Sequence, residues 1–84
     1  ALNMDTIEAG NMTHQFFLSH LESKMSGHNA KMILDPAFLQ EGLSYPYDQE
    51  LNKEQSQNLC LALIKKGGPA FKVGTEIYKK YHKN

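Results

Sequence analysis

The sequence predicts an all-α fold, a compact bundle of four to five short helices that ends in two helices joined by a Gly-Gly-Pro corner. Apolar residues recur at the spacing of one helix face in several segments, whereas the alternation typical of strands is almost absent. Glycine and proline fall between these segments, where they interrupt helices. At 84 residues the chain suits one domain. We place this domain at residues 11–84, after a flexible segment at residues 1–10.

The first helix is expected to begin at Asn11 or Thr13, because either side chain can accept a hydrogen bond from a free amide of the first turn. It should continue to about Met25, where Ser26 and Gly27 end it. Its buried stripe is predicted from residues at helical spacing: Phe17, Leu18, Leu21 and Met25.

The next segment contains two helix-start signals. A turn or short helix is expected from Asn29, and Asp35 then provides an N-cap with Pro36 in the first helical position. Gly42 should end this helix. Because the residue before a proline avoids the helical region, the sequence favours two short helices over one kinked helix across residues 30–41. Both arrangements stay open at this stage.

A connecting loop is expected at residues 43–51, which are the least regular part of the chain. Asn52 and Gln55 stand three apart as a capping-box pair and should begin the following helix. The apolar face of this helix is Leu59, Cys60, Leu63 and Ile64. Lys65 and Lys66 fall in its last turn, where positive charge complements the helix dipole.

The Gly-Gly-Pro corner is predicted to be structural. Gly67 can take the left-handed conformation that ends a helix, Gly68 can turn, and Pro69 suits the first position of the final helix. That helix should extend to about residue 82 along an apolar stripe of Ala70, Val73, Gly74, Ile77, Tyr78 and Tyr81. The predicted core of the domain consists of Phe17, Leu21, Phe38, Leu59, Leu63, Ile64, Val73 and Ile77.

No pattern in the sequence predicts catalysis, a metal or a cofactor. The corner lacks the glycine and the hydroxyl residue that flank the lysine of a phosphate-binding loop, since Phe71 and Val73 surround Lys72. His14 and His20 are six residues apart, whereas helical metal ligands stand three or four apart. Cys60 has the position of a buried core residue, so a reactive thiolate is not expected. We therefore expect no enzyme.

Charge is distributed unevenly along the chain. Residues 1–58 hold eight acids and three lysines, and residues 59–84 hold six lysines and Glu76, which gives −5 and +5. All nine basic residues are lysines, so the bidentate contacts that arginine makes to guanine and phosphate are missing. The apolar runs are too short for a membrane-spanning helix. A single cysteine excludes an internal disulfide, and we expect a cytoplasmic protein.

These observations predict a non-catalytic protein-interaction or regulatory module that can self-associate through its charge asymmetry. A protein partner or a homo-oligomer is favoured over nucleic acid. The residues expected to bind a partner or polyanion are Lys65, Lys66, Lys72, Lys79, Lys80 and Lys83. An alternative is a helix-turn-helix nucleic-acid binder that presents Lys72, Thr75, Glu76, Lys79 and Lys80.

Residues 59–80, "LCLALIKKGGPAFKVGTEIYKK", supply a second alternative. This stretch resembles the fourth and fifth helices of caspase-recruitment domains, in which a leucine-rich helix ends at Lys-Gly and Ala-Phe opens the next helix. The resemblance covers about a quarter of the chain. The segment between Gly42 and Leu59 is short for the third helix and loop of that family. The resemblance implies a death-fold adaptor.

Overall fold

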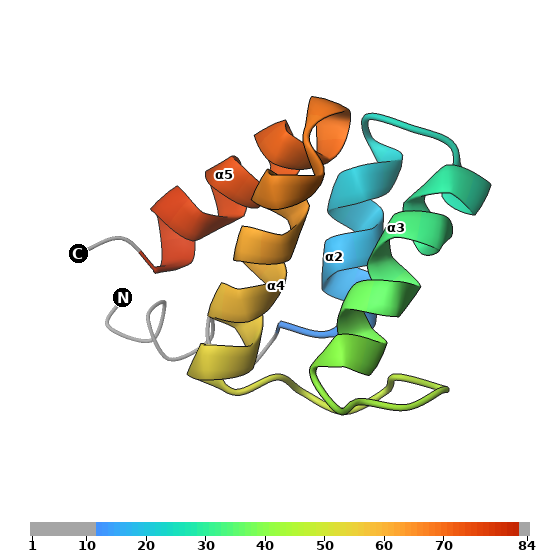
Figure 1. Cartoon of the computed structure of the whole chain (residues 1–84), viewed down its shortest axis with the longest axis vertical. Helices are drawn as coiled ribbons and strands as arrows, with labels where there is room; N and C mark the ends of the chain where they lie inside the picture. The colour runs from blue at the N-terminus through green and yellow to red at the C-terminus, as the bar shows by residue number, and fades with distance from the viewer. Residues whose placement is uncertain (1–11, 83–84) are drawn as a thin grey trace.

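The structure is a computed structural model and describes residues 12–82. This part of the chain contains four α-helices (Figure 1). The helices are α2 (His14–Glu22), α3 (Gly27–Gln40), α4 (Lys53–Lys66) and α5 (Gly68–Tyr81). Residues 12–82 contain no strand, and the predicted all-helical fold is confirmed. The segment predicted to be flexible, residues 1–10, lies outside the described residues.

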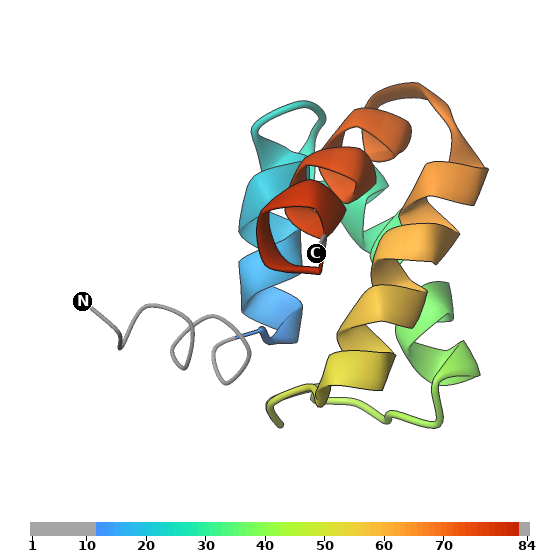
Figure 2. The ribbon, with the colours of Figure 1, turned by 90° about the vertical axis from the view of Figure 1, so that its left-hand side faces the viewer.

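The helices pack as two neighbouring pairs. The most extensive contact is between α4 and α5, and the next is between α2 and α3, with smaller contacts of α3 with α4 and of α2 with α5. The α2–α3 turn and the α4–α5 corner lie at one end of the molecule, and the loop at residues 43–51 lies at the other (Figure 1). The view in Figure 2 shows α5 between α2 and α4.

Side chains from all four helices meet in one core. Seven of the residues predicted there are buried: Phe17, Leu21, Phe38, Leu59, Leu63, Val73 and Ile77. Ile64 is only half-buried. The core also takes apolar residues from outside the helices, namely Met12, Leu43, Tyr47 and Leu51. The amide of Leu51 donates a hydrogen bond to the Met12 carbonyl at 2.9 Å, which ties the loop to the start of the described chain.

The expectation of two short helices across residues 30–41 is wrong, since α3 is one helix with Pro36 inside it. Pro36 and Met32 are both exposed, so the carbonyl of Met32, which proline cannot bond, lies on the solvent side of α3. Asp35 does not cap a helix; its carboxylate instead lies 2.7 Å from Nε2 of His14. A tertiary contact has replaced the local capping role.

The boundary between α2 and α3 also differs from the prediction. The helix α2 ends at Glu22, with Ser23 as its C-cap, and does not reach Met25. Ser26 begins α3, because its hydroxyl accepts the amide N–H of Asn29 at 3.2 Å. A serine expected to end one helix is therefore the N-cap of the next.

The local signals for α4 and α5 match the structure more closely. Asn52 Oδ1 accepts the Gln55 amide at 2.7 Å, and Gln55 Oε1 accepts the Asn52 amide at 3.0 Å. A single residue, Gly67, separates the two helices, with φ 85° and ψ −177°, a conformation almost restricted to glycine. The final helix begins at Gly68, one residue before the predicted start at Pro69, so Gly68 belongs to α5 and not to the turn. Further along α5, a Cβ on Gly74 would lie 2.7 Å from the Cys60 carbonyl oxygen, so glycine allows this close helix approach.

Candidate protein-interaction surface

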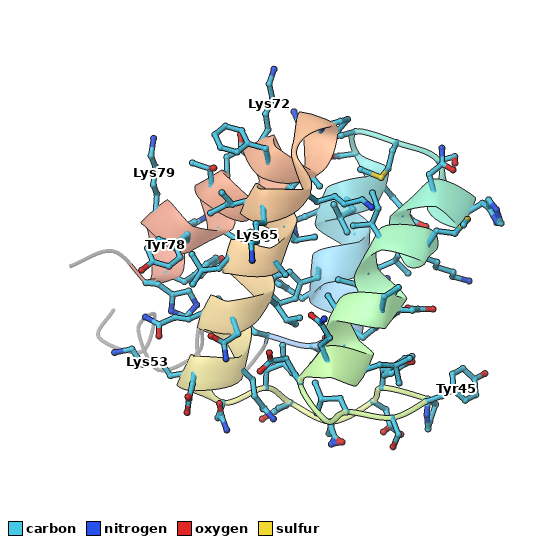
Figure 3. All side chains as sticks on the ribbon, in the orientation of Figure 1. Tyr45, Lys53, Lys65, Lys72, Tyr78 and Lys79 are labelled. Carbon is cyan, nitrogen blue, oxygen red and sulfur yellow. The ribbon has the colours of Figure 1, made fainter. Side chains whose placement is uncertain are left out.

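The lysines predicted to bind a partner do not form one patch. Lys83 lies outside the described residues, and the others are exposed: Lys65, Lys66, Lys72, Lys79 and Lys80. Lys65 projects from α4, and Lys72 and Lys79, two turns apart, project from the same side of α5 (Figure 3). Lys53 adds a further charge from the first turn of α4 (Figure 3). We call Lys53, Lys65, Lys72 and Lys79 the α4–α5 face.

The remaining two lysines lie in other surroundings. Lys80 borders a shallow hollow of about 260 Å³ together with His20, Glu76 and Tyr81. Lys66 is turned toward α3 and lines a hollow next to Pro69. The lysines look equivalent in the sequence, but helix packing places them in three different environments: the α4–α5 face, the hollow at Lys80 and the hollow at Lys66.

The lysines of the α4–α5 face form no ion pair within residues 12–82. The one contact at 4.0 Å or less between a basic and an acidic side chain there joins His14 and Asp35, so no lysine is paired with an acid. Glu76 is nevertheless a neighbour of Lys72 and Lys79 on the surface of α5. Lys65 also sits in the last turn of α4, near the negative end of its dipole. The face can therefore attract an acidic surface without first breaking an internal pair.

Two exposed apolar side chains accompany these lysines. Leu61 on α4 is 49% exposed and Phe71 on α5 is 47% exposed. Leu61 stands four residues before Lys65, and Phe71 stands eight before Lys79, so each shares a helix side with a lysine of the face. The sequence interpretation left both residues out of the predicted apolar stripes but did not consider them as contact residues. Apolar groups beside charges are typical of protein interfaces.

His14 serves packing, whereas two other histidines lie at the surface. His14 stacks on Tyr47 with ring centroids 4.9 Å apart and meets the edge of Phe38 at the same distance. Its Nε2 faces Asp35, so the ring links α2, α3 and the loop. His20 and His28 are exposed. No group of three potential metal ligands occurs among the residues that the structure describes.

A serine–histidine pair that the sequence did not suggest joins the ends of α4 and α5. Ser56 Oγ donates to the Lys53 carbonyl at 3.1 Å, so it accepts a hydrogen bond from His82 Nε2 at 2.8 Å. Burial, and secondly the charge of Lys53, lower the pKa of His82. Because Ser56 is 2% exposed, its hydroxyl is closed off from a substrate.

The thiol of Cys60 offers no reactive group either. Cys60, on α4, is fully buried in the core of the domain, and burial raises the pKa of its thiol to about 12. A thiol with that pKa stays protonated at neutral pH and is a poor nucleophile. Cys60 therefore acts as a small apolar core residue.

Comparison of the chain with protein-family models, with curated proteins and with solved structures returned no match. The resemblance of residues 59–80 to caspase-recruitment domains therefore stays a prediction. Within residues 12–82, no helix has both the length and the apolar character needed to cross a bilayer.

Proposed function

We propose that the chain is a non-catalytic, cytoplasmic protein-interaction or regulatory module whose α4–α5 face binds an acidic protein surface. The observation that carries this proposal is a set of exposed lysines, none paired with an acid within residues 12–82, beside exposed Leu61 and Phe71. In this proposal the Gly-Gly-Pro corner fixes the last two helices of a four- to five-helix bundle side by side, so that residues from both helices form the α4–α5 face. Positive charge steers an acidic partner toward the face, and the apolar side chains supply contact area.

Nucleic acid is a weaker candidate for the same face. The chain has no arginine, and Glu76 lies within the segment that would act as a recognition helix. The single residue between α4 and α5 is also shorter than the three to four residues of a helix-turn-helix turn. The death-fold adaptor remains a third candidate, supported by the resemblance of residues 59–80 alone.

The test is a titration of the ¹⁵N-labelled chain with three polymers, followed by NMR. The polymers are poly-glutamate, a random copolymer of glutamate and tyrosine, and duplex DNA of random sequence. We expect amide shifts to concentrate in α4 and α5, with the copolymer binding more tightly than poly-glutamate because its rings contact Leu61 and Phe71. Tighter binding of DNA than of the copolymer, with a steep loss in salt, would replace the proposal with nucleic-acid binding.

A charge-reversal pair gives the matched control. Lys65→Glu with Lys79→Glu should weaken copolymer binding by about tenfold or more, on the order of 1.4 kcal/mol. Lys31→Glu, on the exposed side of α3, should bind the copolymer within about twofold of the native chain. It changes the net charge half as much as the double variant, and this difference is allowed for in the comparison. Equal losses in the two variants would show that net charge, and not the α4–α5 face, governs binding.

A further inference from the structure

The two ends of the molecule differ in charge and in shape. Residues 41–52 contain three acids, Glu41, Asp48 and Glu50, and no basic residue. At the opposite end, two hollows meet at Pro69 beside the α4–α5 corner. We call them together the corner hollow. One end is thus an acidic loop, and the other is an indented surface.

The corner hollow is apolar inside and positively charged around it. Its first part, about 350 Å³, is lined by Met25, Asn29, Met32, Ile33, Lys66 and Pro69. Its second part, about 420 Å³, is lined by Lys24, Gly68, Pro69 and Lys72. Three lysines and no carboxylate therefore line it. Methionine side chains adapt their shape to an inserted ring, which suits this surface to an aromatic ligand.

The acidic residue nearest in sequence to this end, Glu22, lies outside the lining of the corner hollow. Glu22, at the end of α2, places a carboxylate oxygen against Gly27, where a Cβ would meet it at 2.8 Å. Gly27 is the first residue of α3, and negative charge is favourable at that helix end.

The loop at residues 43–51 presents an aromatic side chain from a fixed base. Tyr45 is 83% exposed, more than the other exposed large apolar side chains of residues 12–82, which are Met32, Leu39, Leu61 and Phe71. Two residues later Tyr47 is buried, stacked on His14 and in edge contact with Phe38. Asp48 follows and is exposed. Because Tyr47 anchors the loop, Tyr45 can be buried by a partner without the entropic cost of ordering a free segment.

We infer that the loop of one copy docks into the corner hollow of a second copy, with Tyr45 in the hollow and Asp48 and Glu50 facing Lys24, Lys66 and Lys72. This inference goes beyond the proposed function, because the corner hollow shares only Lys72 with the α4–α5 face. Tyrosine is a common anchor of protein interfaces, and the charges around both surfaces are opposite in sign. Because the two contacting surfaces differ and lie at opposite ends, a dimer retains one free loop on one copy and one free hollow on the other, and the contact extends into open chains.

The experiment measures mass against protein concentration by sedimentation velocity and light scattering, at low and at high salt. We expect the average mass of the native chain to rise continuously with concentration, without a plateau at the dimer, and to fall when salt is added. A native chain that remains monomeric at millimolar concentration and low salt would overturn the inference, whatever its variants do.

Two complementary variants test the geometry. The loop variant carries Tyr45→Ser and Asp48→Asn, and the hollow variant carries Lys24→Glu and Lys66→Glu; all four positions are exposed. Each alone should stay monomeric, whereas their equimolar mixture should form a one-to-one dimer that grows no further. Such a mixture contains one intact loop and one intact hollow. A mixture that stays monomeric, or a single variant that still forms chains, would contradict the loop-to-hollow contact.

The control separates this inference from the proposed function. Lys65→Glu with Lys79→Glu leaves both the loop and the corner hollow intact, so this variant should still form chains while losing affinity for the glutamate–tyrosine copolymer. If the native chain stays monomeric but binds the copolymer through α4 and α5, the contact between copies fails and the proposed interaction face stands. If it forms chains without binding the copolymer, the α4–α5 face fails.

Discussion

The two helix pairs are held together by different means. In the α4–α5 pair the backbones approach closely at Gly74, and the helices are joined by one residue. In the α2–α3 pair the contact depends on side chains, with the rings of His14 and Phe38 at 4.9 Å and a 2.7 Å hydrogen-bond contact between His14 and Asp35. Mutations should therefore act through added volume in the first pair and through lost side-chain packing in the second.

The largest expected effect is on the side-chain pair. Phe38 is fully buried and contacts the rings of both His14 and Tyr47. Phe38→Ala should lower the free energy of unfolding by about 3 to 5 kcal/mol through lost burial and the cavity left behind. Urea denaturation followed by circular dichroism measures this change. Leu39→Ala, next in the chain and 58% exposed, is the control and should change stability by less than about 1 kcal/mol.

The backbone contact of α4 and α5 can be broken by one methyl group. In Gly74→Ala the new Cβ would lie 2.7 Å from the Cys60 carbonyl oxygen and 2.9 Å from Leu63 Cβ, so the helices must separate. We expect a loss of about 1 to 3 kcal/mol from overpacking, reduced by about 1 kcal/mol because alanine favours the helix. Glu76→Ala, exposed on the same helix, is the control. A more stable Gly74→Ala variant would show that the approach is not tight.

Two prolines sharpen the comparison because they should respond with opposite signs. Pro36 is inside α3, and Pro36→Ala allows the hydrogen bond to the Met32 carbonyl, for an expected gain of about 1 to 2 kcal/mol. Pro69 is in the first turn of α5, where no such bond is lost, so Pro69→Ala should cost about 0.4 to 1 kcal/mol through greater freedom of the unfolded chain. Thermal unfolding measures both changes: the midpoint temperature should rise in Pro36→Ala and fall in Pro69→Ala.

The same contrast explains what the sequence could predict. The start of α4 and the break after it follow from neighbours in the chain: Asn52 with Gln55, and Gly67 before Pro69. These signals need no tertiary information. At α3 the local signals of Asp35 and Pro36 indicated a helix start, but Asp35 pairs with a histidine 21 residues away. A contact between residues that far apart in the chain is absent from any local pattern.

The candidate site divides in a similar way. The lysine content of α4 and α5 was evident from the sequence, whereas the separation of Lys66 and Lys80 from the α4–α5 face depends on how the helices pack. The exposure of Leu61 could have been noticed, since it stands two residues from both Leu59 and Leu63 and so falls on the opposite side of α4. The corner hollow required the structure, because its lining residues come from three segments of the chain.

The smallest expected effect concerns how pH acts on the end of the α4–α5 pair. In the folded state burial, and then Lys53, lower the pKa of His82 from its usual 6.5. Above pH 6.5 the ring is neutral in both states, and the stability linked to His82 is fully present. As the pH falls below 6.5, the unfolded chain binds the proton first, so the free energy of unfolding decreases until the folded-state pKa is passed.

His82→Gln should remove this part of the pH dependence between pH 7 and pH 5, whereas His28→Gln, at an exposed position, should leave it unchanged. The measurement is urea denaturation of the three proteins at several pH values. If the free energy of unfolding depends on pH in the same way in the native chain and in His82→Gln, His82 binds a proton equally well in the folded and unfolded states. Its hydrogen bond to Ser56 would then not hold the end of α5 against α4.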